Sequence, residues 1–275
     1  MVRLICPVRG CGKPLEPAER ALACENRHTF DIAKSGYVNL LQPQDRRSPN
    51  PGDSKEMVQA RRRFVDRGHA ALLAELLWQA IGDLGLPAGF SLLDAGCGEG
   101  YFPGIISSHF PEADIRGVDI SVPAIDAAAR KYPNVRWLVA NADRFLPFVD
   151  GSFDVVMSIT ARKNSAEFRR IISPTGRLLV AVPGEDDQIE LREAVLGKGV
   201  QKDRTESTLS HFADHFALEE EIALRYTAHL NAEGLSDLFA LSYRGARRQA
   251  TEQLARISRL DVTLSYRLFR FKVRT

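Results

Sequence analysis

The stretch SLLDAGCGEG at residues 91–100 joins a short apolar run to a glycine-rich loop, and it decides the fold. Gly96, Gly98 and Gly100 allow the backbone to turn tightly and let a ligand approach it closely. Outward from this loop, apolar runs alternate with helical patterns as far as residue 183. This alternation predicts an α/β fold, a parallel sheet with helices on both faces. We expect strands at 91–95, 113–120, 134–140, 153–159 and 177–183, and helices at 101–110, 122–131 and 164–172.

Acidic residues at the ends of the expected strands indicate the kind of ligand. The loop reads D-x-G-x-G-x-G from Asp94, whereas dinucleotide-binding folds carry G-x-G-x-x-G. Asp94 and Glu99 would repel a pyrophosphate, but they suit a ligand with an ammonium group and ribose hydroxyls. Asp119 ends the next strand, 25 residues beyond Asp94, where a carboxylate can accept both ribose hydroxyls. Asn141 or the backbone amide of Ala142 follows the third strand and could bond an adenine edge.

Residues 91–183 resemble the S-adenosylmethionine site of the class I methyltransferases through LLDAGCGEG, GVDIS, ANADRFLPF, FDVVMSI and ISPTGRLLVAVP. The resemblance implies a Rossmann-like fold with a seven-stranded, mostly parallel sheet and S-adenosylmethionine as cofactor. It also implies a set of cofactor-binding residues, namely Asp94, Gly96, Gly98, Glu99, Gly100, Asp119, Asn141 and Ala142. The alternative is a structural Rossmann loop without a nucleotide, which leaves the acidic strand ends unexplained.

Cysteine and histidine residues near the N-terminus form a metal-binding pattern. Cys6, Cys11, Cys24 and His28 are spaced C-x4-C-x12-C-x3-H. Zinc prefers thiolate and imidazole ligands, usually supplied as two short-spaced pairs, and four protein ligands indicate a structural site. A module of ~40 residues has too little core to fold alone, so a metal would supply the missing stability. A disulfide with two spare ligands is the alternative. The fourth cysteine, Cys97, is expected to be a packed side chain.

Turn-forming residues separate this module from the rest of the chain. Prolines and a glycine make 42–53 a linker, after which a helix runs to about Gly82 with a break near Gly68. We therefore expect a zinc-binding module at 1–41, a linker and helix at 42–82, and a methyltransferase domain at 83–275. The expected later elements are a helix near 187–197, a mobile polar stretch at 198–215, a strand at 218–229, helices within 232–258 and a strand at 261–273.

The chain as a whole is similar to the bacterial 23S ribosomal RNA guanine-N1-methyltransferases, which include the macrolide-resistance methyltransferases of tylosin producers. The similarity runs from the zinc pattern through FDIAKSGYVNLL and PGDSKEMVQARRRFVDRGH to LLDAGCGEGYF. It implies that the zinc module helps to recognise RNA and that N1 of a guanine in a hairpin loop of 23S ribosomal RNA is methylated. It also implies that the zinc ligands are Cys6, Cys11, Cys24 and His28.

Several positions around the expected substrate mouth depart from the family pattern. Ala70 replaces an aromatic residue of some members, Asp187 replaces a histidine near the cofactor, and residues 160–164 read TARKN where relatives carry an aromatic- or Ser-Pro-containing stretch. The sequence therefore leaves open which guanine is methylated. Guanine N1 must lose a proton during transfer, and the catalytic base stays unknown, with Asp187 as one candidate.

The net charge of +2 hides a segregation along the chain, with +5 over residues 1–63, −10 over 64–240 and +7 over 241–275. Basic flanks could hold RNA phosphates, and ordinary solvated surface is the alternative. We expect Arg61, Arg62 and Arg63 to serve RNA and not the cofactor. The other basic candidates are Arg46, Arg47, Arg244, Arg247, Arg248, Arg256, Arg259, Arg267, Arg270, Lys272 and Arg274, and the candidates for stacking on an unpaired base are Tyr101, Phe102 and Arg162.

Composition and hydropathy exclude other classes of protein. Hydrophobic residues make up 44% of the chain and charged residues 26%, which excludes a disordered chain. No apolar run approaches ~18–20 residues, so we expect no membrane span. Without a signal-peptide pattern, we expect a cytoplasmic protein. Two rival functions remain, a small-molecule methyltransferase with a structural zinc module and a non-enzymatic RNA-binding protein. Relatives form dimers, and the sequence leaves open whether this chain forms a homodimer.

Overall fold

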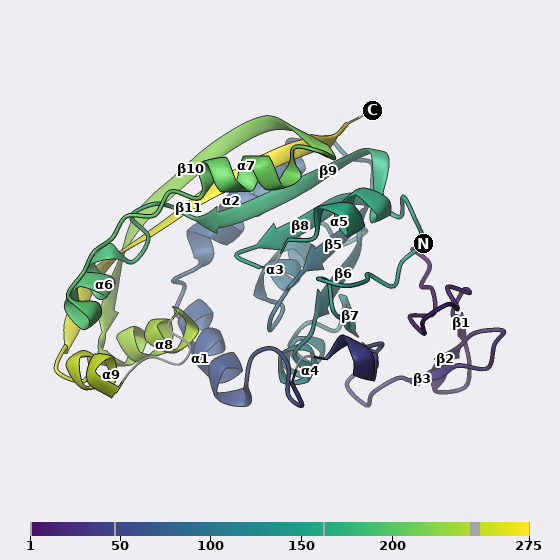
Figure 1. Ribbon diagram of the computed structural model, residues 1–275, viewed down its shortest axis with the longest axis horizontal. Coiled ribbons are helices and arrows are strands. Elements are labelled where there is room, and N and C mark those ends of the chain that lie inside the picture. The colour runs from purple at the N-terminus through teal and green to yellow at the C-terminus, as the bar shows by residue number, and fades with distance from the viewer. Residues whose placement is uncertain (1, 47, 162, 243–247, 275) are drawn as a thin grey trace.

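The computed structural model describes residues 2–46, 48–161, 163–242 and 248–274, so the expected RNA contacts Arg47, Arg162, Arg244 and Arg247 lie outside the described residues. Within these ranges, eight strands form one large sheet (Figure 1). In spatial order the strands are β10 (Phe216–Asn231), β11 (Arg259–Val273), β9 (Ile172–Pro183), β8 (Phe153–Ile159), β5 (Ser91–Ala95), β6 (Asp114–Asp119), β7 (Arg136–Val139) and β4 (Val38–Asn39).

The sheet is parallel from β4 to β9, and β11 runs antiparallel between β9 and β10. The Rossmann-like methyltransferase fold is thereby confirmed, and seven of the strands are the expected ones. The eighth is β4, which comes from the N-terminal segment and pairs with Leu138 and Val139 of β7. Two residues give no alternating pattern in the sequence, so this strand was missed.

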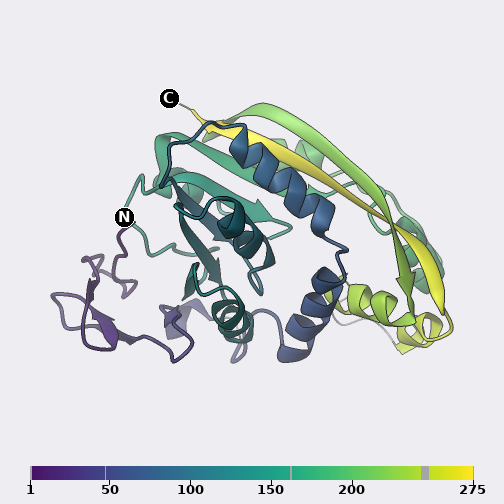
Figure 2. The same ribbon diagram turned by 180° about the vertical axis from the view of Figure 1, so that it is seen from behind.

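Helices cover both faces of the sheet because successive side chains of a strand point to opposite sides. Leu92 packs in one core with Leu77, whereas its neighbour Leu93 packs in another core with Phe168. The first face is covered by α2 (Ala71–Gly82), α3 (Tyr101–His109) and α4 (Val122–Lys131), and the second by α5 (Ser165–Ile171) and α7 (Thr205–Phe212) (Figures 1 and 2).

The polar stretch 198–215, expected to be mobile, contains helix α7, so this prediction missed a helix. Phe212 is fully buried, and its ring contacts those of Phe168, Phe216 and Phe271. A single aromatic residue in a polar segment is too weak a pattern to predict a helix, and the packing that stabilises it comes from distant strands.

The long strands β10 and β11 extend beyond the rest of the sheet, where they form an arch in Figure 1. Four helices pack against the far half of this arch around a third core that contains Phe64, Leu235 and Leu264. They are α1 (Lys55–Asp66), α6 (Ile189–Leu196), α8 (Ala232–Ser242) and α9 (Arg248–Leu254). The break expected after α1 is confirmed at Gly68, where φ is +83°.

The N-terminal segment forms a small antiparallel sheet of β1 (Glu16–Pro17), β2 (Ala21–Ala23) and β3 (Thr29–Asp31). Leu4 bridges to Phe148, and Cys6 and Cys24 share a buried core with Phe148. The segment therefore packs directly on the methyltransferase sheet. The linker that follows begins with a short 3-10 helix, η1 (Pro43–Asp45). Among the described helices, none has both the length and the apolar composition to cross a membrane.

Candidate functional site

A cavity of about 520 Å³ opens at the carboxyl ends of the parallel strands. Ligands of open α/β sheets bind at this edge. Seven of the eight residues expected to bind the cofactor line the cavity, namely Asp94, Gly96, Gly98, Glu99, Asp119, Asn141 and Ala142. The topology brings them together because β5, β6 and β7 are adjacent and parallel.

The glycine loop folds tightly against β6. The backbone N–H groups of Gly96 and Cys97 donate to the carbonyl oxygen of Val118, at 2.8 and 3.1 Å. Gly96 has a φ of +94°, and a Cβ atom there would lie 2.5 Å from Cβ of Ala161 on the opposite wall. Any side chain at this position would therefore clash with Ala161, and the positive φ also favours glycine.

Gly100 is the exception among the expected residues, because it does not line the cavity. Its φ is +83°, and a Cβ atom would lie 2.4 Å from Cη2 of Trp137 and 2.8 Å from Cβ of Ala128. Gly100 therefore lets α3 begin close to β7 and α4. Cys97 is buried, as expected, and burial raises the pKa of its thiol well above the usual range, which disfavours a nucleophilic role.

Asp94 is a buried carboxylate whose two oxygens have no hydrogen-bond partner among the described residues. Its exposed fraction is 1%. Burial, together with repulsion by Asp119 and Glu99, raises its pKa to about 8. Burial also raises the pKa of Glu99 to about 7, although the positive charge of Arg61 opposes this shift. A wall of desolvated carboxyl groups fits a cationic ligand.

Asp119 is held in place by the backbone around it. Its Oδ2 accepts a hydrogen bond from the N–H of Gly98 at 2.9 Å, and its Oδ1 accepts one from the N–H of Ser121 at 2.8 Å. Burial is the main reason that its pKa is raised. Each carboxylate oxygen can accept a second hydrogen bond, so the fixed group remains able to bind two hydroxyls.

The side-chain amide of Asn141 is engaged by the protein itself. Its Nδ2 donates to the carbonyl oxygen of Asp45 at 2.8 Å, and its Oδ1 accepts from the N–H of Asp143 at 3.0 Å. Of the two groups expected at the adenine edge, this arrangement favours the backbone amide of Ala142.

The linker forms one wall of the cavity, which the sequence did not reveal. Ser48, Pro51, Gly52 and Asp53 line the cavity. Ser121 donates to the carbonyl oxygen of Asp53 at 2.7 Å. A Cβ atom on Gly52 would lie 2.6 Å from Cβ of Ser121, so only glycine allows this approach. The Pro-Asn-Pro-Gly turn was visible as a turn, but its contact with α4 depends on the fold.

Arg61 also lines the cavity, which favours a role at the cofactor site over the expected role in RNA binding alone. Its Nη2 lies 3.0 Å from Oδ2 of Asp53, and its Nε lies 3.2 Å from Oε2 of Glu99. It therefore ties α1 to both the linker and the glycine loop. Arg63 is turned to another partner, since its Nη2 lies 2.6 Å from Oδ1 of the buried Asp237.

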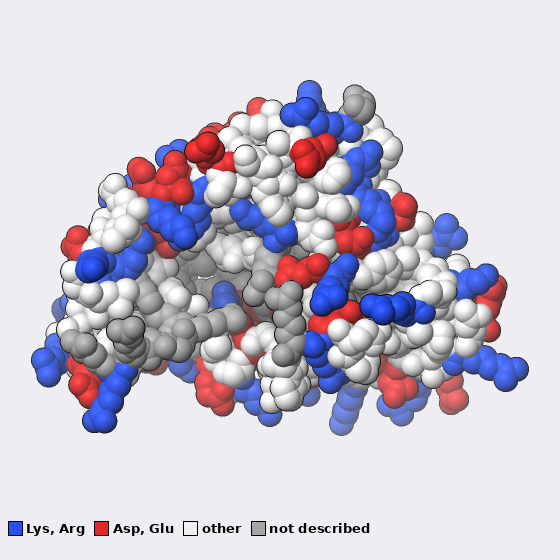
Figure 3. All heavy atoms as spheres, viewed as in Figure 1, with Lys and Arg blue, Asp and Glu red and all other residues white. Residues whose placement is uncertain are grey.

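Several C-terminal cations are neutralised by carboxylates. Strand pairing places Arg270 opposite Glu220 and brings Arg267 near Glu221, with ion-pair distances of 2.9 and 3.1 Å. Arg248 pairs with Glu252 within α9. Figure 3 shows positive and negative side chains interspersed over one face. On this face, basic side chains therefore do not form a separate surface.

The aromatic residues expected to stack on a base and the acidic residue considered as a base lie in different places. Phe102 lines the cavity, and Tyr101 lies half-buried beside it with ring centroids 5.3 Å apart. Asp187 does not line the cavity. Its Oδ1 accepts from the N–H of Ser265 at 3.1 Å, and its Oδ2 accepts from Nε2 of Gln188 at 3.0 Å. Burial raises its pKa to about 6, but this position gives it no contact with the cofactor cavity.

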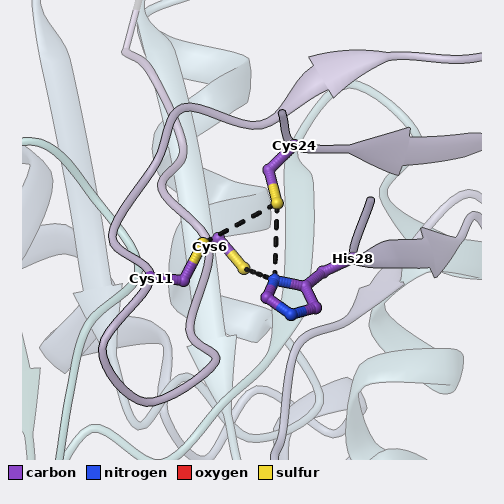
Figure 4. Close-up of side chains that lie close together, drawn as sticks. All are labelled: Cys6, Cys11, Cys24 and His28. Atoms are coloured by element: carbon purple, nitrogen blue, oxygen red, sulfur yellow. Dashed lines mark hydrogen bonds between the residues drawn. The ribbon is translucent and has the colours of Figure 1, made fainter. Parts of the chain in front are cut away.

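The expected zinc residues converge from two loops (Figure 4). Ligand atoms of Cys6, Cys11, Cys24 and His28 all lie within 4.8 Å of one another. Nδ1 of His28 lies 3.3 Å from Sγ of Cys6 and 3.5 Å from Sγ of Cys24. The cysteines are free thiols, which contradicts the disulfide alternative. Three sulfur atoms and one imidazole nitrogen at this separation fit a tetrahedral zinc ion.

Comparisons with known proteins match two regions of the chain to known families. Residues 4–49 match a zinc-ribbon family described as "RlmA, N-terminal", and residues 92–180 match a family described as "Methyltransferase domain". A 23S rRNA (guanine(748)-N(1))-methyltransferase from Streptomyces fradiae is 36% identical over 95% of this chain and 94% of its own. A relative from Micromonospora griseorubida, provisionally named a 23S rRNA (guanine-N(1)-)-methyltransferase, is 31% identical over 98% of this chain and 97% of its own.

A solved structure, that of the YcgJ protein from Bacillus subtilis, matches with a TM-score of 0.53 and 16% identity. It covers 73% of this chain and 97% of the YcgJ chain. At this low identity the match supports the fold alone.

Proposed function

Because this chain belongs to the family of 23S rRNA (guanine-N1)-methyltransferases, we propose that it transfers a methyl group from S-adenosylmethionine to N1 of a guanine in a hairpin loop of 23S ribosomal RNA. The observation that carries this proposal is the buried, unpartnered carboxylate of Asp94 in a cavity at the end of a class I methyltransferase sheet. Such a group fits the ammonium of a methionine-derived cofactor and would repel a dinucleotide phosphate.

We propose that the walls of the cavity divide the recognition of the cofactor among them. Asp94 would hold the ammonium group, the backbone of Gly96 and Gly98 would admit the methionine portion, and Asp119 would accept the ribose hydroxyls. The backbone amide of Ala142 would bond the adenine edge. Bound S-adenosylmethionine supplies a methyl group already activated by its sulfonium centre, so that no metal is needed for the transfer.

The role of the protein in the transfer is to position the acceptor and exclude water. Guanine N1 lies on the pairing edge, so the base must be unpaired or flipped out before it enters the mouth. Holding N1 in line with the methyl group supplies much of the acceleration. Phe102 lies in the cavity wall, where its ring can pack against a base. The N1 proton leaves during attack, and no residue of the cavity is assigned as its acceptor.

We further propose that Cys6, Cys11, Cys24 and His28 bind one structural zinc ion. The metal would organise the module of residues 1–41. The linker and helix of 42–82 and the methyltransferase domain of 83–275 would follow it in the chain. Four protein ligands leave no open coordination position, so this zinc would take no part in methyl transfer. The proposed setting is the cytoplasm, where ribosomal RNA is modified. A homodimer remains a proposal, which the mass of the protein in solution would test.

Methylation of defined RNA tests the proposed function. The protein is incubated with labelled S-adenosylmethionine and either protein-free 23S ribosomal RNA transcript or a pool of small-molecule acceptors. We expect label in the RNA, and a primer-extension stop at one guanine, because a methyl group on N1 blocks base pairing. Label only in small molecules would support the rival methyltransferase function. Absence of cofactor binding by calorimetry would support the non-enzymatic rival.

A further inference from the structure

A second, open groove adjoins the cofactor cavity and shares Asp143 and Ala161 with it. Its volume is about 660 Å³. One side consists of Asp143, Ala161 and residues 163–166, which include the start of α5, and the other consists of Ser207 and His211 of α7. The lining residues that are not shared with the cavity are polar or small, namely Lys163, Asn164, Ser165, Ala166, Ser207 and His211. A substrate that reaches the cofactor from this side would lie along the groove.

Lys163 is half-buried in this groove. Its Nζ donates a hydrogen bond to Oγ1 of Thr208 in α7, at 2.7 Å. Within the described part of the chain, no carboxylate lies within ion-pair distance of this ammonium group. By contrast, the buried guanidinium of Arg116 pairs with Asp114 at 3.1 Å. Lys163 is thus a positive charge that the protein shields from water without supplying a counter-ion.

A second positive charge nearby makes it less favourable for the half-buried Lys163 to stay protonated. The pKa of Lys163 is lowered, first by burial and then by the positive charge of Arg204. Nη1 of Arg204 lies 3.4 Å from the carbonyl oxygen of Pro183, the last residue of β9. Like charges that are shielded from water repel each other. An anion bound in the groove would therefore stabilise the charged forms of both Lys163 and Arg204. Lys163 follows β8, which pairs with the strand that carries Asp94, and the guanidinium of Arg204 lies at the end of β9.

We propose that Lys163, with Arg204 as its cationic neighbour, binds a phosphodiester of the unpaired RNA strand next to the target guanine, and that the groove between α5 and α7 carries this strand. The proposal rests on the proposed function, because the anion is taken to be part of the RNA substrate. Serine, asparagine and histidine side chains of the groove suit sugar and phosphate oxygens, which give affinity without reading sequence. The groove would therefore set the direction in which the RNA crosses the mouth.

Replacement of Lys163 tests this proposal through the salt dependence of RNA binding. The full-length protein is titrated with a 23S ribosomal RNA hairpin at several salt concentrations. For Lys163→Gln, we expect the slope of log Kd against log salt to decrease by about 0.7, the value for one phosphate of a single strand. We expect KM for RNA to rise about fivefold, in line with the loss of one phosphate contact, while the Kd for S-adenosylmethionine stays unchanged. Lys163→Arg should restore the slope.

Lys198→Gln is the matched control, since Lys198 is exposed and does not line the groove. An unchanged salt slope in Lys163→Gln, or an equal decrease in Lys198→Gln, would overturn the proposal. Thermal unfolding of each variant shows whether the protein remains folded, and Thr208→Val, which keeps the charge, should retain the slope. If Lys163→Gln lowers the slope as expected but the wild-type protein methylates no RNA, the proposed function fails while the groove remains an RNA site.

Discussion

Asp94 should make cofactor binding depend on pH. The pKa of its carboxyl group is raised from 3.8 to about 8 in the free cavity, mainly by burial. At about 1.4 kcal/mol per pH unit, this corresponds to roughly 6 kcal/mol against the ionised form. A cofactor ammonium beside Asp94 favours ionisation, so binding should release a proton wherever the free carboxyl group is still protonated. The affinity for S-adenosylmethionine should therefore rise with pH and level off above about 8.

The size of the expected increase in affinity follows from this coupling of cofactor binding to proton release. One released proton changes the affinity at most tenfold per pH unit, which limits the change between pH 6 and pH 8 to about a hundredfold. Glu99, whose pKa is raised to about 7, contributes in the same direction. In the free protein, the raised pKa of Asp94 has the opposite consequence for folding. The folded state keeps a proton that the unfolded state has lost, so stability should fall as the pH rises from about 4 to about 8.

Calorimetric titration with S-adenosylmethionine at pH 6, 7 and 8 measures how the affinity changes with pH. Repeating it in two buffers of different ionisation enthalpy counts the protons released on binding. Asp94→Asn cannot ionise, so we expect weaker binding at pH 8 and a smaller dependence on pH. Asp83→Asn is the control, because Asp83 is exposed and outside the cavity. An affinity that is flat from pH 6 to pH 8, with no proton released by the wild type, would refute the reasoning.

Three further predictions concern other parts of the structure. Gly100→Ala should lower the free energy of unfolding in urea by about 2–3 kcal/mol through its clash with Trp137, whereas Gly85→Ala, which has a positive φ but open space, should cost about 1 kcal/mol. Arg61→Gln should weaken S-adenosylmethionine binding in calorimetry about tenfold, whereas an equal effect of Arg62→Gln would contradict the assignment. Removal of metal by a strong chelator should release one zinc ion per chain and increase amide hydrogen exchange around Cys6 and Cys24, and unchanged exchange there would contradict a structural role.

The sequence predicted the central strands and the cofactor loop because both are recorded in local patterns. The run 91–95 is apolar and ends at glycines, and the acids of the cavity end consecutive strands, so their meeting at one sheet edge follows from parallel topology. The zinc cluster was predictable because the spacing of its ligands is itself the signal. In each case, residues close together in the sequence carried most of the information.

The missed features depend on contacts between distant segments. Arg61 looked like one of three equivalent arginines, but helical spacing turns its side chain towards Glu99 while Arg63 reaches Asp237. Likewise, the basic C-terminus seemed suited to RNA until pairing with β10 placed Glu220 beside Arg270. Net charge over a stretch of sequence therefore describes a surface poorly when antiparallel strands of opposite charge become neighbours.

The N-terminal part of the chain, which was expected to serve RNA, also builds part of the cofactor cavity. The linker after the zinc module is part of the cavity wall, since Asn141 binds the carbonyl of Asp45 and Ser121 binds that of Asp53. Strand β4, just before the linker, covers the edge of β7, the strand that leads to Asn141. A shift of the zinc module against the sheet would have to break this pairing or move the linker. A displacement of the module would thereby alter the linker wall of the cavity, because the side chains of Asn141 and Ser121 hold the linker by hydrogen bonds to its backbone carbonyls.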